Sequence, residues 1–422
     1  MPMTTFFLSR QHKASGARAN TNTFKHYCGK TIIMSSIKGV LHVVGLPHTV
    51  VNLQYSHCAF TGKILRFAKM MQAHGWHVVE YSNGVSASAA AEKVQILSES
   101  TLKILSKRTS ENEDYGKDVN NHELVTAFTQ LAAHALKARA VDGDIVCHVF
   151  GPSSELVAAT PRCYHVESGI GYTCTDGALP YRVYETSAWM HWHLGRRHLE
   201  WGRNYEFVAP NYYDLADWPV VLKPQSAGAP YVLYFGRITE SKGMTTIISI
   251  ARRMPTTRFV LVGQGDPAPW TAQAENIESR PPAMGADRAA LLGNASVLLA
   301  PSNFIEPFCG SAVEAQLCGT PVVTTAFGAF WETVEDGVTG YRCNSLADFV
   351  GALRRAPMLD RGTIAERARR LYSLETVGDT YDTIFNNISD QRAAGWYSRT
   401  SHKFRSVELP KEAEEVTEAT EP

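Results

Sequence analysis

The 422-residue sequence predicts an α/β protein with two doubly wound domains that face a central cleft. The length suits two cores of roughly 150–200 residues better than one. Each half of the chain alternates β-branched apolar runs with segments of helical periodicity, the order typical of parallel sheets covered by helices. Residues 211–228, which contain Pro219, Pro224 and Gly228, separate the halves and are predicted to be the linker.

The first half opens with an apolar run at residues 38–47, "KGVLHVVGLP", which is typical of a buried parallel strand. Residues 60–76 have helical apolar spacing that closes at Gly75, and residues 77–83 are typical of the next strand. This is one strand–helix–strand unit. Later elements of this half are a helix over residues 123–141 and strands at 145–151 and 162–172, and residues 204–214 end the half.

The second half repeats the pattern after the linker. A strand at residues 229–238, a helix at 244–254 and a strand at 257–266 form its first unit. The remaining elements are a short helix from residue 287, a strand at 296–303, a helix from about Ser311, a strand at 320–328, a strand after 336, and helices to about residue 386. The predicted domains are therefore residues 34–210 and 229–386, with a return of 387–404 to the first domain left open.

The two ends of the chain differ in charge. No acidic residue precedes Glu80, and residues 1–33 are basic and rich in Ser and Thr. We interpret them as a disordered leader, with Met34 as an alternative start and a targeting role left open. Residues 405–422 are rich in Glu and are predicted to be a disordered acidic tail.

Composition excludes several classes of protein. With 44% hydrophobic and 19% charged residues the chain is globular, and its formal net charge of zero gives no global reason to expect nucleic acid. No apolar run is long enough to predict a transmembrane helix. None of the eight cysteines forms a Cys-x-x-Cys pair, so we expect reduced thiols and a cytoplasmic location.

Residues 304–323 carry the most specific pattern, "FIEPFCGSAVEAQLCGTPVV". Two acids, Glu306 and Glu314, flank the expected start of a helix at Gly310 and Ser311. Unpaired N–H groups at a helix N-terminus, with the helix dipole, favour an anion. Carboxylates accept hydrogen bonds from hydroxyl groups. The pattern therefore suits a ligand that carries both phosphate and hydroxyls.

A second set of residues points to the same ligand. Arg237 and Lys242 follow the strand that ends at Gly236, so both cations can reach one point at the edge of the sheet. Phosphate binds cations of this kind.

Together these motifs resemble the donor-binding domain of family-four retaining glycosyltransferases of the GT-B fold, in which two Rossmann-like domains face each other. The resemblance is dense over residues 205–345 and includes "YFGRITESKGM", "FVLVGQGD" and "GAFWETVEDGVTGYRC". It also includes "VAPNYYD" at 208–214, where Tyr212 replaces the usual glycine.

The resemblance implies a role for each matching residue. Glu306 is implied to contact the transferred sugar as a catalytic residue, and Glu314 the ribose. The alternative is that Glu306 caps a turn and Glu314 merely complements the helix dipole. The full set of expected donor-binding residues is Gly236, Arg237, Lys242, Gly263, Phe308, Cys309, Gly310, Ser311 and Glu314.

Two further motifs have competing interpretations. "GQG" at 263–265 lacks the third glycine of a dinucleotide-binding loop, so we assign Gly263 to the nucleotide-side turn. "DGD" at 142–144 resembles a metal-binding Asp-x-Asp, but it precedes its strand, and an ordinary turn is favoured. We therefore expect no metal and no cofactor beyond the nucleotide-diphosphate sugar as co-substrate.

The first half offers fewer candidates. Gly62 and Lys63 take the place of the family's glycine-rich loop that faces the donor phosphate. His165 and Glu167, two apart on one strand face, are candidate catalytic residues. His48 and His57 are weaker candidates in the loop before the first helix.

Two segments of the first half are open to a functional or a structural interpretation. Residues 181–202 are dense in aromatic residues, and we favour an amphipathic helix packed on the first sheet over a sugar- or phosphate-binding surface formed with Arg196 and Arg197. Lys63, Arg66 and Lys69 share one broad side of a helix, which leaves open a peripheral membrane contact, although a solvated face is commoner.

The sequence thus predicts a metal-independent retaining glycosyltransferase that moves a sugar from a nucleotide sugar to a glycan, lipid or small-molecule acceptor. The alternatives are a storage-glucan phosphorylase or synthase, for which the chain is short, a sugar-nucleotide epimerase, and a non-catalytic nucleotide-sugar-binding module of the same fold. An epimerase would need no acceptor.

Overall fold

A computed structural model describes residues 26–27, 30–31, 37–55, 58–107, 116–173, 179–200, 205–225 and 229–391 of the chain. The acidic tail at 405–422 and residues 392–404 lie outside the described residues. Of the expected leader, the description covers a pair of two-residue antiparallel strands, β1 (His26–Tyr27) and β2 (Lys30–Thr31).

The first large sheet has seven parallel strands in the order β5-β4-β3-β6-β7-β8-β9. Their bounds are β3 (Val40–Val44), β4 (His77–Ser82), β5 (Glu92–Gln95), β6 (Ile145–His148), β7 (Tyr164–Ile170), β8 (Tyr181–Tyr184) and β9 (Glu206–Val208). All five residues of β3 are buried, as expected for a central strand covered on both faces. Helices α1 (Ala59–Ala73), α2 (Glu99–Leu105), α3 (Gly116–Val119), α4 (His122–Lys137), α5 (Ser154–Ala159) and α6 (Ser187–Arg196) belong to this half.

The second sheet has six parallel strands in the order β12-β11-β10-β13-β14-β15. Their bounds are β10 (Tyr231–Phe235), β11 (Arg258–Val262), β12 (Ile277–Arg280), β13 (Val297–Ala300), β14 (Val322–Thr325) and β15 (Gly340–Cys343). The order changes direction between β10 and β13, and ligands of open α/β sheets bind beside such a point, at the carboxyl ends of the strands. The helices here are α7 (Met244–Arg253), α8 (Ala268–Thr271), α9 (Gly285–Asn294), α10 (Gly310–Leu317), α11 (Phe330–Thr333), α12 (Leu346–Arg355) and α13 (Arg361–Tyr372).

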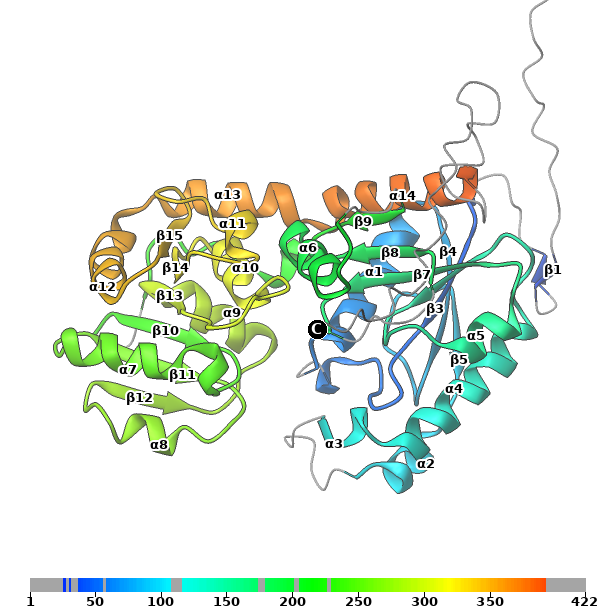
Figure 1. The fold of residues 1–422 in the computed structure, drawn as a ribbon, viewed down its shortest axis with the longest axis horizontal. Helices are drawn as coiled ribbons and strands as arrows, with labels where there is room; N and C mark the ends of the chain where they lie inside the picture. The colour runs from blue at the N-terminus through cyan, green and yellow to red at the C-terminus, as the bar shows by residue number, and fades with distance from the viewer. Residues whose placement is uncertain are drawn as a thin grey trace, which may run out of the picture.

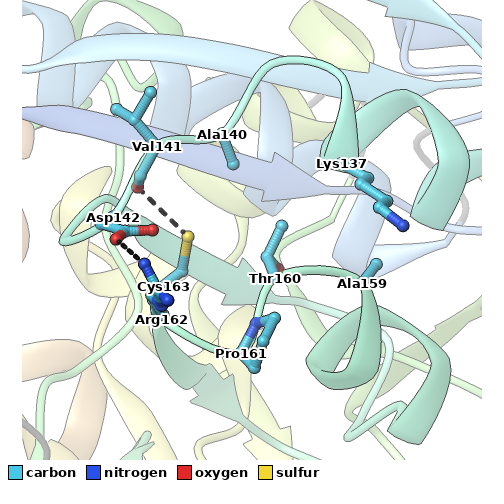
Figure 2. Close-up of a pocket in the computed structure, with 9 residues that line it drawn as sticks. All are labelled: Lys137, Ala140, Val141, Asp142, Ala159, Thr160, Pro161, Arg162 and Cys163. Carbon is cyan, nitrogen blue, oxygen red and sulfur yellow. Dashed lines mark hydrogen bonds and ion pairs between the residues drawn. The ribbon is translucent and has the colours of Figure 1, made fainter.

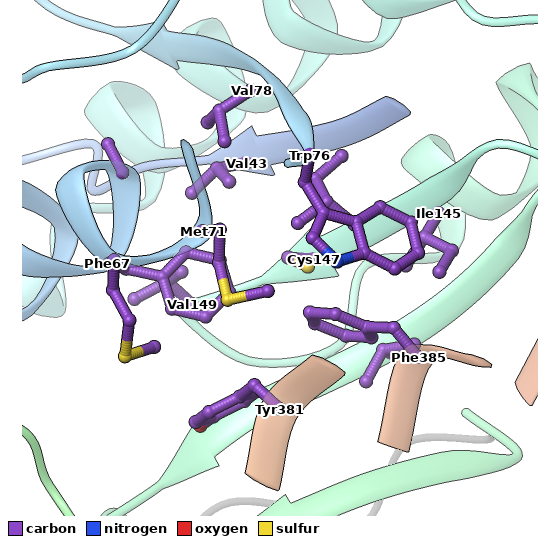
Figure 3. Close-up of a cluster of buried hydrophobic side chains, with 14 of the residues drawn as sticks. Val43, Phe67, Met71, Trp76, Val78, Ile145, Cys147, Val149, Tyr381 and Phe385 are labelled. Carbon is purple, nitrogen blue, oxygen red and sulfur yellow. The ribbon is translucent and has the colours of Figure 1, made fainter. Parts of the chain in front are cut away.

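The two sheets lie side by side, and the last helix returns from the second to the first (Figure 1). This helix, α14 (Leu374–Gln391), packs against α1. Tyr381 and Phe385 of this helix join the core beneath the first sheet. The ring of Tyr381 makes an edge contact with Phe67, and the ring of Phe385 makes one with Trp76 (Figure 3). The chain therefore returns from residue 374, before the segment 387–404 at which we left a return open.

The chain crosses between the sheets twice, and the two crossings touch. Tyr213 forms a parallel bridge with Ser373, in which Tyr213 N donates to Tyr372 O over 2.8 Å and Leu374 N donates to Tyr213 O over 3.1 Å. Tyr212 is buried in the first core while Tyr213 is buried in the second. The tyrosine that replaces the family's glycine at 212 thus anchors the linker, packing on Phe67 and Tyr381.

The predicted fold class is confirmed, and one predicted element is wrong. Residues 181–202 do not form one helix: β8 occupies Tyr181–Tyr184 and α6 begins only at Ser187. Alternation explains the strand, because Tyr181 and Val183 face the first core while Tyr184 joins a separate cluster with Trp189. The short strands β5 and β12 were not predicted either.

Candidate active site

Glu306 lies in the loop after β13, next to the end of β10. Lys242 Nζ stands 2.7 Å from Glu306 Oε1, and the hydroxyl of Ser302 donates to the same oxygen. The ammonium also lies 4.6 Å from the centroid of the Phe304 ring. The Glu306 side chain is only 3% exposed, so the lysine compensates a carboxylate that has lost most of its water.

The N-terminus of α10 is open toward the same edge. Cys309 precedes the helix in a left-handed conformation, φ 64°, and gives it no side-chain cap. A non-glycine residue in this region is strained and recurs at functional sites. Among the described residues no hydrogen bond satisfies the N–H groups of Gly310 and Ser311, so the helix end is prepared for an anion.

Glu314 lies one turn into α10 and is held by an arginine that the sequence analysis missed. Arg288 of α9 donates to Glu314 Oε2 and lies over the ring of Phe235, 4.6 Å from its centroid. Nothing in the sequence distinguishes Arg288 from other helical arginines, because the contact depends on how α9 packs against α10.

Two other expected donor residues have structural tasks. Gly263 has φ 155°, and a Cβ there would lie 1.7 Å from the carbonyl oxygen of Gly236. Only glycine allows the turns after β10 and β11 to approach so closely. Phe308 is buried in the second core, in edge contact with Tyr372.

Arg237 is exposed, and its side chain forms no ion pair among the described residues.

The first domain contacts this loop on both sides of Glu306. Ile305 packs against the cluster of Ile170, Tyr184 and Trp189, and Thr186 Oγ1 donates to Pro307 O over 2.9 Å. Farther along, Glu332 accepts the backbone N–H groups of Ser187 and Ala188 over 2.9 and 2.8 Å, so it caps α6 from the other domain. Glu306 is therefore held where the two halves of the protein meet.

Gly62 and Lys63 lie within the first turns of α1 and not in a loop. Lys63 is buried, pairs with Glu185 and donates to the carbonyl oxygen of Gly169 over 2.9 Å. Burial lowers the pKa of Lys63, and Glu185 opposes that effect. Because Glu185 directly precedes Thr186, this ion pair is one residue from the contact with Pro307.

The second half matches the family model "Glycosyl transferases group 1" over residues 229–356. We refer to this matched segment, residues 229–356, as the group 1 domain. Glycogen synthase from Mycobacterium tuberculosis is 31% identical over 176 residues, which are 39% of this chain and 42% of that protein. D-inositol 3-phosphate glycosyltransferase from Mycobacterium bovis is 32% identical over 185 residues, 40% of this chain and 38% of that protein. The match thus spans about two fifths of these relatives.

Solved structures resemble the chain beyond the group 1 domain. AviGT4, a glycosyltransferase involved in avilamycin A biosynthesis, superposes with a TM-score of 0.62 at 19% identity, over 84% of this chain and 98% of that one. Sucrose-phosphate synthase from Thermosynechococcus elongatus gives 0.62 at 16% identity over 84% and 100%. HepE from Anabaena gives 0.54 at 12% identity over 82% and 99%. The chain has the GT-B fold.

His165 and Glu167 do not reach the group 1 domain by any contact among the described residues. His165 is the second residue of β7, and its ring nitrogens lie 2.9 Å from His148 Nε2 and from Thr160 O. Glu167 is buried at mid-strand, where it accepts from the hydroxyl of Tyr172 over 2.8 Å and pairs with Arg182 at 3.5 Å. The described partners of both side chains belong to the first domain, and the Tyr172 that donates to Glu167 packs on the same cluster as Ile305.

Burial raises the pKa of Glu167 from 4.5 to about 7, against the hydrogen bond from Tyr172 and the charge of Arg182. Between these values the folded protein holds a proton that the unfolded chain releases. The stability contributed by Glu167 is therefore present in full below pH 4.5 and lost as the pH rises to about 7.

We expect the wild type to lose up to about 3 kcal/mol of unfolding free energy relative to Glu167→Gln over this interval, since one pH unit is worth about 1.4 kcal/mol. Urea unfolding of both proteins at several pH values measures the difference. Parallel pH profiles would contradict the assignment.

The three cations of α1 differ in exposure: Lys63 is buried, Arg66 is half-buried and Lys69 is exposed. Lys63 pairs with Glu185, Lys69 pairs with Asp214, and the guanidinium of Arg66 lies 5.2 Å from the centroid of the Tyr213 ring. They form no joint basic face, which removes the observation behind a peripheral membrane contact. No described helix combines the length and hydropathy required to cross a bilayer.

Other candidates of the first half also have local partners. In the "DGD" turn, Asp142 pairs with Arg162 at 2.9 Å, and Asp144 Oδ2 lies 3.1 Å from His42 Nε2. His48 is buried, with its ring centroid 5.6 Å from that of Phe150. His57 lies outside the described residues.

A cavity of about 180 Å³ opens elsewhere, where α4 leads into β6 and α5 leads into β7 (Figure 2). The segments around it enter these strands at their amino ends, the opposite edge of the sheet from Thr186 and Glu306. It is lined by Lys137, Ala140, Val141, Asp142, Ala159, Thr160, Pro161, Arg162 and Cys163. Two of its charged groups, Asp142 and Arg162, pair with each other, and the cavity lies at the other edge of the sheet, so it has no part in the candidate active site.

Proposed function

We propose that the protein is a glycosyltransferase that moves a sugar, with retention of configuration, from a nucleotide-diphosphate sugar to a separate acceptor. One observation carries this proposal. In a group 1 domain, the uncapped N-terminus of α10 lies between two buried carboxylates, Glu306 and Glu314, each paired with a cation. An anion with hydroxyl groups on either side fits this arrangement.

In this proposal the diphosphate binds at the N-terminus of α10. The N–H groups of Gly310 and Ser311 donate to it, and Arg237 and Lys242 supply positive charge from the turn after β10. The left-handed Cys309 aims the first turn of the helix at the ligand. Because Arg237 has no carboxylate partner among the described residues, its full charge is available to phosphate.

The two carboxylates bind the hydroxyl groups. Lys242 and Ser302 both contact Glu306 Oε1, which leaves Oε2 for the transferred sugar. Glu314 accepts from the ribose, while Arg288, which lies over the ring of Phe235, stays on its Oε2. The sugar thus lies at the loop that contacts the first domain, and the acceptor arrives from that side.

Catalysis follows from position and charge. The cations and the helix N-terminus stabilise the departing diphosphate as negative charge builds on it. The positive charge at the diphosphate comes from Arg237 and Lys242 in place of a metal ion. We therefore expect activity in excess EDTA. Inactivation by EDTA that manganese restores would assign the leaving group to a metal ion.

The relatives and neighbours support the donor class. The matched relatives are a glycogen synthase and an inositol-phosphate glycosyltransferase, and the HepE structure contains UDP-glucose. The acceptor we propose is a glycan, a lipid or a small molecule.

A thermal-shift screen tests the donor class. A ligand at a hundred times its dissociation constant adds about 2.7 kcal/mol to the unfolding free energy, which raises the melting temperature by several degrees. We expect this for at least one sugar among UDP-, GDP- and ADP-linked hexoses, and no shift with uridine, guanosine or adenosine. A melting temperature unchanged by every nucleotide sugar would contradict the proposal.

A further inference from the structure

We propose that Arg66, in helix α1 of the first domain, is a third cation of the donor site and binds the phosphate distal to the nucleoside. This inference rests on the function proposed above. It assigns a separate role to a residue that the sequence analysis grouped with Lys63 and Lys69 as one basic stretch.

The guanidinium of Arg66 is directed back along α1 toward the domain interface. A Cβ placed on Gly62, one turn earlier, would lie 3.2 Å from Arg66 Nη1. The absent side chain of Gly62 therefore leaves the room that the guanidinium fills. This gives Gly62 a function in the site, although it lies in a helix and not in a phosphate-binding loop.

Tyr213 connects Arg66 to the N-terminus of α10. Arg66 lies 5.2 Å from the centroid of the Tyr213 ring, and the Tyr213 hydroxyl is 3.5 Å from Gly310 O, at the first residue of the helix. Charges of both domains meet at this hydroxyl: burial raises the pKa of Tyr213 far above its usual value, Glu314 raises it further, and Arg66 and Arg288 lower it. Arg66 thus acts at the point where we place the diphosphate.

Arg66 shares with Arg237 the lack of a carboxylate partner among the described residues, unlike four other cations nearby. Lys63, Lys69, Lys242 and Arg288 are each paired, with Glu185, Asp214, Glu306 and Glu314 respectively. Among the described residues Arg66 forms no ion pair, and its Nε is buried without a hydrogen-bond partner. The carboxylate of Asp214 is held by Lys69 instead. A buried, unpaired guanidinium nitrogen is costly unless an anion completes it.

The distal phosphate is the one that Arg66 reaches. Glu314 and Arg288, which we assign to the ribose, belong to the second domain and lie one turn into α10 or beyond it. Arg66 approaches from the first domain and, through Tyr213, lies at Gly310, the first residue of the helix. The phosphate nearest the sugar lies on that side, so a first-domain cation senses whether it is present.

Calorimetric titration with UDP, GDP and ADP, and with UMP, GMP and AMP, tests the inference. For the diphosphate that the wild type binds, we expect Arg66→Ala to raise the dissociation constant about 10- to 100-fold, the range for loss of charge-assisted hydrogen bonds. The variant should bind the matching monophosphate within about 3-fold of the wild type, because that ligand lacks the distal phosphate. A general distortion of the site would instead weaken the binding of both ligands alike. Arg66→Lys should lie between, since an ammonium keeps the charge without the planar fork.

Lys69→Ala is the matched control, because it removes a cation one turn along the same helix whose partner is Asp214 in the linker. It should leave both affinities unchanged. Equal diphosphate binding by the wild type and Arg66→Ala would overturn the inference, and so would an equal loss for diphosphate and monophosphate. A wild type that binds none of the three diphosphates would overturn the proposed function itself. If Arg66→Ala does not fold, Arg66→Lys decides the question. Wild-type diphosphate affinity in Arg66→Lys would overturn a contact between the planar guanidinium and the distal phosphate.

Discussion

Glu306→Ala loses sugar transfer by at least about 100-fold while it folds and still binds the donor, because the carboxylate contacts the group that moves. Loss of one positioned group in a site of this kind costs about 10² to 10³ in turnover. Initial rates of nucleoside diphosphate release, measured with and without acceptor, give the effect on kcat. Glu306→Gln should recover only a small part, since an amide keeps the bond from Ser302 but not the charge that matches Lys242.

The control for this experiment is Glu335→Gln. Glu335 belongs to the same domain, but it pairs with Arg367 at 2.6 Å on the surface of α13, away from the candidate site. Its rate should equal that of the wild type. If Glu306→Ala turns over at the wild-type rate, the carboxylate is a structural cap, which is the alternative interpretation of the motif. If the wild type converts one nucleotide sugar into another without any acceptor, the result would instead favour an epimerase.

Arg237→Ala and Lys242→Ala should each weaken donor binding by about one to two powers of ten, since a charge-assisted hydrogen bond to phosphate is worth about 1.5–3 kcal/mol. The structure separates their effects. Arg237 is exposed and unpaired among the described residues, so its loss should change affinity with little change in kcat. Lys242 also holds Glu306, so its loss should lower both affinity and kcat.

The double variant shows whether the two cations bind one diphosphate. If they do, its loss should fall short of the sum of the single losses, because the ligand shifts once either contact is gone. Arg252 and Arg253 are the matched controls: both are exposed on α7, where they donate to the backbone carbonyls of Gln273 and Ser249. Replacing either should leave donor affinity unchanged. Additive losses of donor affinity, together with a normal kcat in Lys242→Ala, would contradict the binding of one diphosphate by both cations.

The sequence predicted the second sheet more completely than the first. Its strands carry continuous apolar runs, and Gly263 marks a turn that no other residue allows. In the first sheet, β8 was hidden because Tyr181 and Tyr184 lie in a stretch whose aromatic residues also suit a helix. The return of α14 was hidden as well, since the partners of Tyr381 and Phe385 lie some 300 residues earlier in the chain.

The candidate site divides in the same way. Glu306, Lys242 and Glu314 could be selected because their spacing along the chain matches their arrangement around β13 and α10. Arg66, Glu185 and Arg288 could not, because each becomes relevant only through packing between elements distant in sequence. His165 and Glu167 were selected for their place on a strand, and alternation alone does not say which face of a sheet the other domain covers.

The most direct test of the account is transfer itself, followed by NMR with the nucleotide sugar that gives the largest thermal shift. We predict that the wild type consumes the donor, releases nucleoside diphosphate and yields a product with the donor's anomeric configuration, and that Glu306→Ala does none of these although it binds the donor. A wild type that binds no nucleotide sugar and releases no nucleoside diphosphate with any acceptor would contradict the central claim, that the edge between Glu306 and the N-terminus of α10 is a sugar-transfer site.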